Sequence, residues 1–320
     1  MFSVTCPLSS LLAERIFTVK VHTCLILMVA IAGINCMWGP REARGDSVYV
    51  LTSSTIEKFA SSGGAGTFFG NPGFGGASLA LDSAGDLFVA NYTYGYIQKI
   101  TPSGASSIFA SGLQTPDGLA FDSAGNLFVA SDANAILKFT PDGASTVFST
   151  NVSRPQNLAF DSAGNLYVAN LGNQTIEKFG SSGASSVYVS NARLPIGIAF
   201  DAKGNLFISG LTDTIEEVAP DGTRSIFAME DGPYQMAFDS AGNLYAASVT
   251  GTVDKFAPNG TGTVFASGLD GPLGIAIQSA VVPLPAAVWM GMCEMVLVVG
   301  LGMVRGRVHA RERGGAVAWE

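Results

Sequence analysis

The middle of this 320-residue chain lacks the two side chains that most often carry enzyme chemistry. Between residues 46 and 280 there is no histidine and no cysteine, because both histidines and all four cysteines lie outside this range. A Ser–His–Asp triad, a cysteine nucleophile and the usual His- or Cys-based zinc and iron sites are therefore excluded there. The region also has no disulfide, so cysteine usage does not report its compartment.

Charged side chains are also scarce, at 13% of the chain, about half of the ~25% usual in soluble domains. In residues 46–280, nine basic and twenty acidic side chains leave a net charge of −11. Because a negative surface repels phosphate backbones, nucleic acid is excluded as a partner. The chain has instead 39 glycines and many Phe, Val, Leu and Ile residues, which is typical of a turn-rich β protein rather than a helical or disordered one.

An internal repeat dominates the same region. The unit Asp-Ser-Ala-Gly-Asn-Leu-aromatic recurs with small changes at intervals of 38 to 40 residues, starting at Asp82, Asp122, Asp161, Asp201 and Asp239. Each copy has four short apolar runs, as at 118–121, 127–130, 136–139 and 146–148. Four such runs separated by turn residues predict a small antiparallel sheet. The Asp and Gly of the unit suit a tight turn between its first two strands.

One such sheet cannot cover its own apolar faces, but copies packed radially can. The sequence therefore predicts an all-β protein, a six-bladed β-propeller of four-stranded antiparallel blades over residues 46–280. Five units are continuous, and the next copy stops after its first strand at 274–280, while its missing strands are found at 47–59. We expect the C-terminal segment to supply the inner strand of this shared blade and the N-terminal segment the other three, which leaves no open edge.

These residues resemble the NHL repeat family over about 47–280. The resemblance implies a six-bladed ring with a ligand-binding face around its central channel. It does not determine the function, because propellers carry lyases, lactonases and pure binding modules alike. The antibiotic-lyase propellers use a histidine, which residues 46–280 lack. The propeller lactonases hold a divalent cation with carboxylate and Asn oxygens at the channel mouth.

Both ends of the chain have the composition of targeting segments. Residues 21–34 are apolar and follow Arg15 and Lys20, which predicts a signal peptide and leader over 1–45. Residues 281–320 contain VPLPAAVW, an apolar run over 286–304 and then arginines. The run is close to the ~20 residues that span a bilayer as a helix. The positive-inside rule places the arginines in the cytoplasm and the preceding chain outside.

This order of motif, helix and arginines resembles the PEP-CTERM sorting tail of Gram-negative bacteria. The residues that carry the resemblance are Val282, Pro283, Pro285, Trp289, Arg305 and Arg307. It implies anchoring in the inner membrane, recognition and removal of the tail by an exosortase-type enzyme, and release to the cell surface or an exopolysaccharide matrix. Glu294 departs from the pattern, since a charge at the centre of a span costs roughly 2.5–3.5 kcal/mol. An ordinary C-terminal anchor is the alternative.

Within the predicted ring, the repeated turns form one face and loops that differ between copies form the other. Uniform turns indicate scaffold, whereas varied polar loops are typical of recognition surfaces. Amides and aromatic faces suit sugars. The candidate ligand-binding residues on the varied face are Tyr92, Asp117, Arg154, Asn157, Asn170 and Tyr234.

The sequence favours an exported, non-catalytic module that binds or scaffolds extracellular polysaccharide or a surface protein, without a cofactor and without catalytic residues. A purely structural matrix component is a further possibility. The alternative is a metal-dependent, lactonase-like hydrolase that uses the channel. Its divalent cation, such as Ca²⁺, would be held by the hard oxygen ligands of Asp117, Asp132, Asn157 and Asn170. The sequence alone does not decide whether the chain is an enzyme.

Overall fold

A computed structural model describes residues 45–180 and 183–279. The predicted signal segment and leader, and the predicted sorting tail with its membrane helix, lie outside the described residues. Within the described ranges, no helix is long and apolar enough to cross a membrane.

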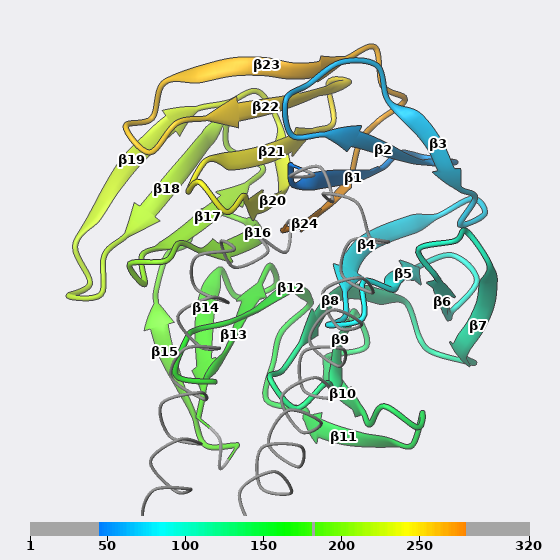
Figure 1. The fold of residues 1–320 in the computed structure, drawn as a ribbon. Coiled ribbons are helices and arrows are strands. Elements are labelled where there is room, and N and C mark those ends of the chain that lie inside the picture. Colours follow the sequence, from blue (N-terminus) through cyan, green and yellow to red (C-terminus); the bar gives the residue numbers. More distant parts are fainter. Residues whose placement is uncertain (1–44, 181–182, 280–320) are drawn as a thin grey trace, which may run out of the picture. The chain divides into compact units, whose positions relative to one another are not determined.

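The described residues form six separate four-stranded sheets, each antiparallel throughout (Figure 1). Innermost in the sheets are β4 (Gly76–Leu81), β8 (Pro116–Phe121), β12 (Pro155–Phe160), β16 (Pro195–Phe200), β20 (Pro233–Phe238) and β24 (Gly274–Gln278). The second strands are β5 (Leu87–Asn91), β9 (Leu127–Ser131), β13 (Leu166–Asn170), β17 (Leu206–Gly210), β21 (Leu244–Ser248) and β1 (Ser47–Leu51). The all-β, six-bladed propeller predicted from the repeat is thereby confirmed.

The remaining strands complete each blade toward the rim. The third strands are β6 (Tyr96–Ile100), β10 (Ala135–Phe139), β14 (Thr175–Phe179), β18 (Thr214–Val218), β22 (Thr252–Phe256) and β2 (Ile56–Ala60). The outer strands are β7 (Ser106–Ser111), β11 (Ser145–Ser149), β15 (Ser185–Val189), β19 (Arg224–Met229), β23 (Gly262–Ser267) and β3 (Thr67–Gly70).

The inner strands form a closed circle, because each one contacts the inner strand of both neighbouring blades, and β24 contacts β4 and β20. The closing sheet has the order β24-β1-β2-β3. In it Val50 lies opposite Ile275, and Val48 lies opposite Ile277. The backbone N–H of Leu273 donates to the carbonyl of Leu51 at 2.9 Å. The shared blade expected from the incomplete repeats is therefore present.

The core lies between blades rather than within them. Six clusters of buried apolar side chains each join two neighbouring sheets. Phe128 of β9, for example, contacts Phe160 of β12 in the next blade, with ring centroids 5.1 Å apart and edge-to-face geometry. Such a pair adds about 0.5–1.5 kcal/mol beyond its area burial. Because each blade covers its neighbours, the ring is stable only when it is complete.

The repeated turn between inner and second strands is held by its aspartate. The Oδ1 atom of Asp122 accepts the backbone N–H groups of Ala124 and Asn126 at 3.0 and 2.8 Å, and Oδ2 accepts the side-chain amide of Asn126 at 2.7 Å. Gly125 has φ +82°, a conformation that costs glycine little. The turns at Asp161 and Asp239 repeat these bonds. This face of the ring is therefore a uniform scaffold.

Candidate functional site

The opposite face has a cavity of about 360 Å³ at the mouth of the central channel. Its lining includes Ala77, Asp117, Gln156 and Tyr234, which are the second residues of four inner strands, and Leu273, which directly precedes β24. The loops around these strands add Phe74, Tyr92, Thr93, Asp132 and Arg154. We call this space the channel-mouth cavity. Because the inner strands of four blades and the residue that precedes a fifth contribute to it, the cavity depends on the closed ring.

Asp117 is the most unusual side chain of the channel-mouth cavity. It is only 6% exposed, and its carboxyl has no ion-pair or hydrogen-bond partner among the residues that the structure describes. Burial, and then the nearby charge of Asp132, raise the pKa of this carboxyl to about 7. A protonated carboxyl can donate one hydrogen bond and accept others. Asp117 therefore presents unused hydrogen-bonding capacity at the cavity wall.

Asp132 is the centre of a small network that joins three blades. The Nε of Arg154 lies 3.3 Å from its Oδ1, and the hydroxyl of Tyr92 donates to its Oδ2 at 3.3 Å. The backbone N–H of Arg154 donates to the Asn134 side chain at 2.7 Å, and Arg154 has φ +47°. The network therefore orients Tyr92 and Arg154 at the edge of the cavity, although Arg154 itself is largely exposed.

Tyr234 comes from β20, in a blade not adjacent to that of Asp117. Burial, followed by the charges of Asp117 and Tyr92, raises the pKa of its phenol to about 12. Burial and Asp132 also raise the pKa of Tyr92. Both phenols are therefore neutral near pH 7 and can donate hydrogen bonds. With the exposed ring of Phe74, the cavity combines aromatic faces with polar groups.

Four of the six residues predicted as ligand-binding line this cavity, and two do not. Asn157 accepts a hydrogen bond from the backbone N–H of Ile198 at 3.3 Å, which ties β12 to the next blade. Asn170 is fully buried, and its Oδ1 accepts the backbone N–H of Ser153 at 3.1 Å. Its amide group lies 3.4 Å from the Glu177 carboxylate. Both amides therefore hold the protein's own loops and strands in place.

The four oxygen ligands proposed for a divalent cation are consequently not brought together. Asp117 and Asp132 line the channel-mouth cavity, whereas Asn157 and Asn170 are engaged elsewhere. Asp132 is also paired with the guanidinium of Arg154, which competes with a cation for its oxygens. In the described ranges, no group of three or more His, Cys, Asp or Glu side chains is placed to hold a metal ion. These donors do not fit a dedicated cation site.

Gln156 was not among the predicted site residues, yet it lines the cavity and is 8% exposed. A signal for it exists in the repeat. Asp117 stands five residues before the turn residue Asp122, and Gln156 stands five before Asp161. The same position in the other copies is occupied by Ala77, Ile196, Tyr234 and Leu273. Aligning the copies therefore identifies the residues that face the channel mouth.

The fold places this chain in the class of six-bladed β-propellers, and several solved structures of propeller proteins are similar to it. A gluconolactonase from Xanthomonas campestris matches with a TM-score of 0.58 and 17% identity, over 64% of this chain and 83% of that one. A streptogramin B lyase matches with a TM-score of 0.56 and 16% identity, over 71% of this chain and 87% of that one. A third match is a catalytically inactive variant of a virginiamycin B lyase from Staphylococcus aureus, solved with quinupristin. Its TM-score is 0.56 and its identity 16%, over 75% of this chain and 94% of that one.

At these identities the similarity concerns the fold alone. No family model and no curated protein matches the sequence.

Proposed function

We propose that the channel-mouth cavity binds a saccharide ring, and that the propeller is a non-catalytic module for polysaccharide or a glycosylated surface protein. The cavity volume of about 360 Å³ lies in the usual range for small-molecule sites, roughly 300–1,000 Å³. The rings of Phe74, Tyr92 and Tyr234 provide apolar faces, and Gln156 provides an amide. Sugars present both C–H faces and hydroxyl groups, which such a lining matches.

The observation that carries this proposal is the largely buried side chain of Asp117, whose carboxyl has no hydrogen-bond or ion-pair partner among the described residues. A carboxyl on a cavity wall that no protein group satisfies keeps its hydrogen-bonding capacity for a ligand. A sugar hydroxyl would both donate to and accept from this carboxyl. The neighbouring phenols of Tyr92 and Tyr234 supply further donors.

Export and sorting belong to the same proposal. The apolar segment at 21–34 and the VPLPAAVW tail support passage across the inner membrane, transient anchoring and processing by an exosortase-type enzyme. Extracellular polysaccharide would then be the natural ligand. The mass of the secreted protein tests this step: processing predicts a chain that ends before Ala286, and an intact C-terminus on secreted material contradicts it.

Binding is tested by titrating the full chain with neutral oligosaccharides identified on a glycan array. Replacing Tyr234 by Ala should weaken binding roughly tenfold, because it removes an aromatic face and a donor. The matched control is Tyr94→Ala, since Tyr94 is 63% exposed on the same face and does not line the cavity. Equal weakening by both substitutions, or binding of no glycan at all, contradicts the proposal.

One observation favours a second candidate, the hydrolysis of a sugar lactone. A carboxyl whose pKa is near 7, such as that of Asp117, is suited to proton transfer at neutral pH. Gluconolactonases also share the fold. Because the predicted cation ligands are not brought together, the reaction would rest on Asp117 as the proton carrier rather than on a metal.

This candidate is tested with D-glucono-1,5-lactone, whose spontaneous opening in buffer gives the baseline. Hydrolysis above that baseline which falls at least tenfold in Asp117→Asn supports an enzyme, and the saccharide module predicts none. Activity that is abolished by EDTA and restored by Ca²⁺ would show a metal-dependent lactonase, contrary to the geometry of the four proposed ligands.

A further inference from the structure

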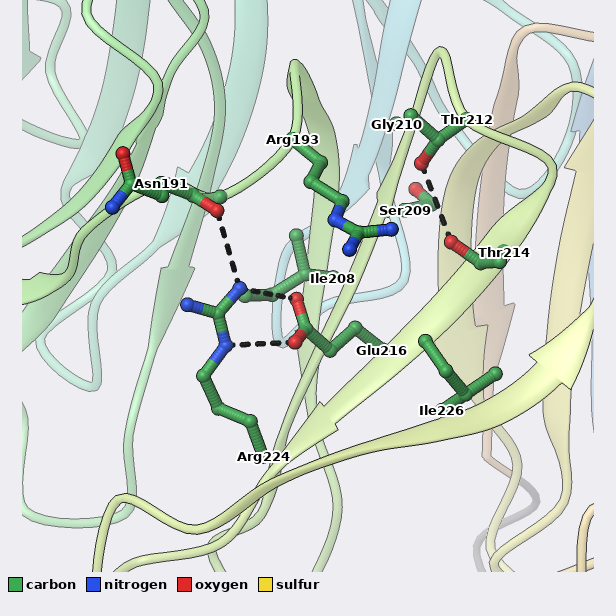
Figure 2. Close-up of a pocket in the computed structure, with 11 residues that line it drawn as sticks. Asn191, Arg193, Ile208, Ser209, Gly210, Thr212, Thr214, Glu216, Arg224 and Ile226 are labelled. Carbon is green, nitrogen blue, oxygen red and sulfur yellow. Dashed lines mark hydrogen bonds and ion pairs between the residues drawn. The ribbon is translucent and has the colours of Figure 1, made fainter.

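A second cavity, of about 320 Å³, lies in the blade formed by β16–β19 (Figure 2). Its lining includes Arg193, Thr212, Thr214, Glu216 and Arg224, and it shares no lining residue with the channel-mouth cavity. The loops that precede β16 and follow β17 both contribute to it. The cavity therefore extends from loops of the varied face along β18 and β19. We call it the blade cavity.

The only carboxylate that lines the blade cavity is already neutralised. Glu216 receives two hydrogen bonds from Arg224, at 2.7 and 2.8 Å, in a side-by-side arrangement. Arg224 also donates to the backbone carbonyls of Ser190 and Asn191, at 2.8 and 3.3 Å. Arg224 is therefore committed to Glu216 and to the loop of the preceding blade.

Arg193 has no such partner. The other two arginines of the described ranges are paired, Arg154 with Asp132 and Arg224 with Glu216. The guanidinium of Arg193 makes no ion pair or hydrogen bond with any described residue, and Figure 2 shows it projecting over the cavity without an interaction. The lining therefore carries one positive charge that has no carboxylate partner, whereas residues 46–280 as a whole have a net negative charge.

The blade that contains this cavity departs from the repeat at the end of its second strand. In four other blades the second strand ends in a polar residue whose side chain bonds to a nearby loop, namely Asn91, Ser131, Asn170 and Ser248. In the β16–β19 blade the last residue of the second strand is Gly210. A Cβ atom added to it would lie 2.4 Å from the carbonyl oxygen of Leu194. The loop that carries Arg193 therefore packs directly on the strand, with no polar side chain between them.

We propose that Arg193 forms a subsite for a single carboxylate, that of a uronic acid residue in a saccharide. The planar guanidinium matches the two oxygens of a carboxylate. The hydroxyls of Thr212 and Thr214, which are hydrogen-bonded to each other at 3.3 Å, line the same cavity. One unmatched positive charge in a region of net charge −11 suits one carboxylate rather than a dense polyanion.

The subsite would make the proposed saccharide binding selective for sugars that carry a carboxylate. It rests on the proposed saccharide-binding function. The two cavities are connected through the protein. The hydroxyl of Ser209, which lines the blade cavity, donates to the backbone carbonyl of Tyr234, whose side chain lines the channel-mouth cavity. In this proposal the channel-mouth cavity takes a neutral sugar residue and the blade cavity an acidic one.

Calorimetric titration of the full chain with methyl β-glucuronide and methyl β-glucoside tests the subsite. The two probes differ in one carboxylate, and we expect the glucuronide to bind about tenfold more tightly, as a charge-assisted bond predicts. Arg193→Gln should remove this preference. The matched control is Lys203→Gln, which removes an exposed positive charge from a turn of the scaffold face and should preserve it.

Equal affinity for the two probes, or an equal loss of preference in both variants, overturns the subsite. Its failure is distinguishable from failure of the saccharide proposal. Glucoside binding that weakens in Tyr234→Ala, without any preference for glucuronide, leaves only the channel-mouth proposal standing. Glucuronide binding that depends on Arg193, without any glucoside binding, leaves only the anion subsite.

Discussion

Asp117 owes its properties to its place in the repeat. As the second residue of β8 it lines the channel-mouth cavity, and it is only 6% exposed. Desolvation disfavours its charged form, and Asp132 adds like-charge repulsion. Near neutral pH the cavity therefore offers a partly protonated carboxyl between two neutral phenols, which suits an uncharged, hydroxyl-rich ligand.

The raised pKa makes Asp117 a pH-dependent cost to stability. An unfolded Asp ionises near its ordinary value of 3.8, whereas the folded one ionises at about 7. The folded state therefore holds the proton more tightly, and stability falls as the pH rises between these values. Asp117→Asn should raise the free energy of unfolding at pH 8 by up to about 4 kcal/mol and change it little at pH 4.

Urea denaturation at the two pH values measures this effect. Glu230, whose pKa burial and Asp254 raise to about 8, contributes equally to both proteins and cancels in the comparison. The control is Asp213→Asn, which removes an exposed carboxylate from the same face. If Asp117→Asn raises the free energy of unfolding at pH 8 no more than Asp213→Asn does, the Asp117 carboxyl is not desolvated.

Sequence reasoning at the residue scale located the varied face but not the direction of each side chain. Gln156 and Asn157 are adjacent in β12, and the register of β12 against β13 shifts at Gln156. Gln156 lines the cavity, and Asn157 bonds to the neighbouring blade. Loop variability alone does not separate the two, whereas the distance to the turn aspartate does.

At the scale of the blade, a lysine of the third strand lies over an aromatic ring of the second in five of the six sheets. The pairs are Lys58–Tyr49, Lys99–Phe88, Lys138–Phe128, Lys178–Tyr167 and Lys255–Tyr245, with nitrogen-to-centroid distances of 4.9 to 5.3 Å. Four of these lysines also lie within 4 Å of the turn aspartate. The blade of β16–β19 has Glu217 at this position, opposite Phe207.

Replacing Glu217 by Lys should therefore stabilise the protein. The new ammonium would lie over Phe207 and near the turn residue Asp201, as in the other blades, and we expect a gain of about 0.5–1 kcal/mol. Glu217→Gln is the control, because it removes the negative charge without adding a cation. Thermal unfolding of the three proteins measures the effect. The inference fails if Gln stabilises as much as Lys, or if Lys destabilises.

The same blade shows what the sequence could not provide at this scale. The repeat predicts its four strands, and the structure has them. The blade cavity depends on Arg193, Gly210 and Arg224, which are far apart in the repeat and meet only after folding. Gly210 stands where four other copies have Asn or Ser, so the departure is visible in the sequence, but its spatial consequence is not.

At the scale of the whole molecule, closure of the ring depends on β24. The incomplete sixth copy predicts this closure, because Gly274–Gln278 matches the inner strands of the other copies. Gln278 replaces the turn aspartate and accepts a hydrogen bond from Tyr49 at 3.2 Å instead. The two ends of the propeller are thus held by a ladder of backbone bonds and by this side-chain bond.

A disulfide across this ladder tests the closure. Ser47 and Gln278 lie opposite each other, so Ser47→Cys combined with Gln278→Cys should form a bond on mild oxidation. Linking the ends of so long a chain should stabilise the fold by roughly 3–5 kcal/mol. Peptide mapping identifies the bond, and the reduced variant is the control. Failure of the two cysteines to join would contradict the shared blade.

Binding of a saccharide ring at the channel mouth can be observed directly as intermolecular NMR contacts. With methyl β-glucoside and the full chain carrying labelled tyrosine, we expect nuclear Overhauser effects from sugar protons to the rings of Tyr92 and Tyr234. Contacts instead to Tyr167 and Tyr245, whose rings lie beneath lysines of the blades, or saturable binding without contact to Tyr92 and Tyr234, would contradict it.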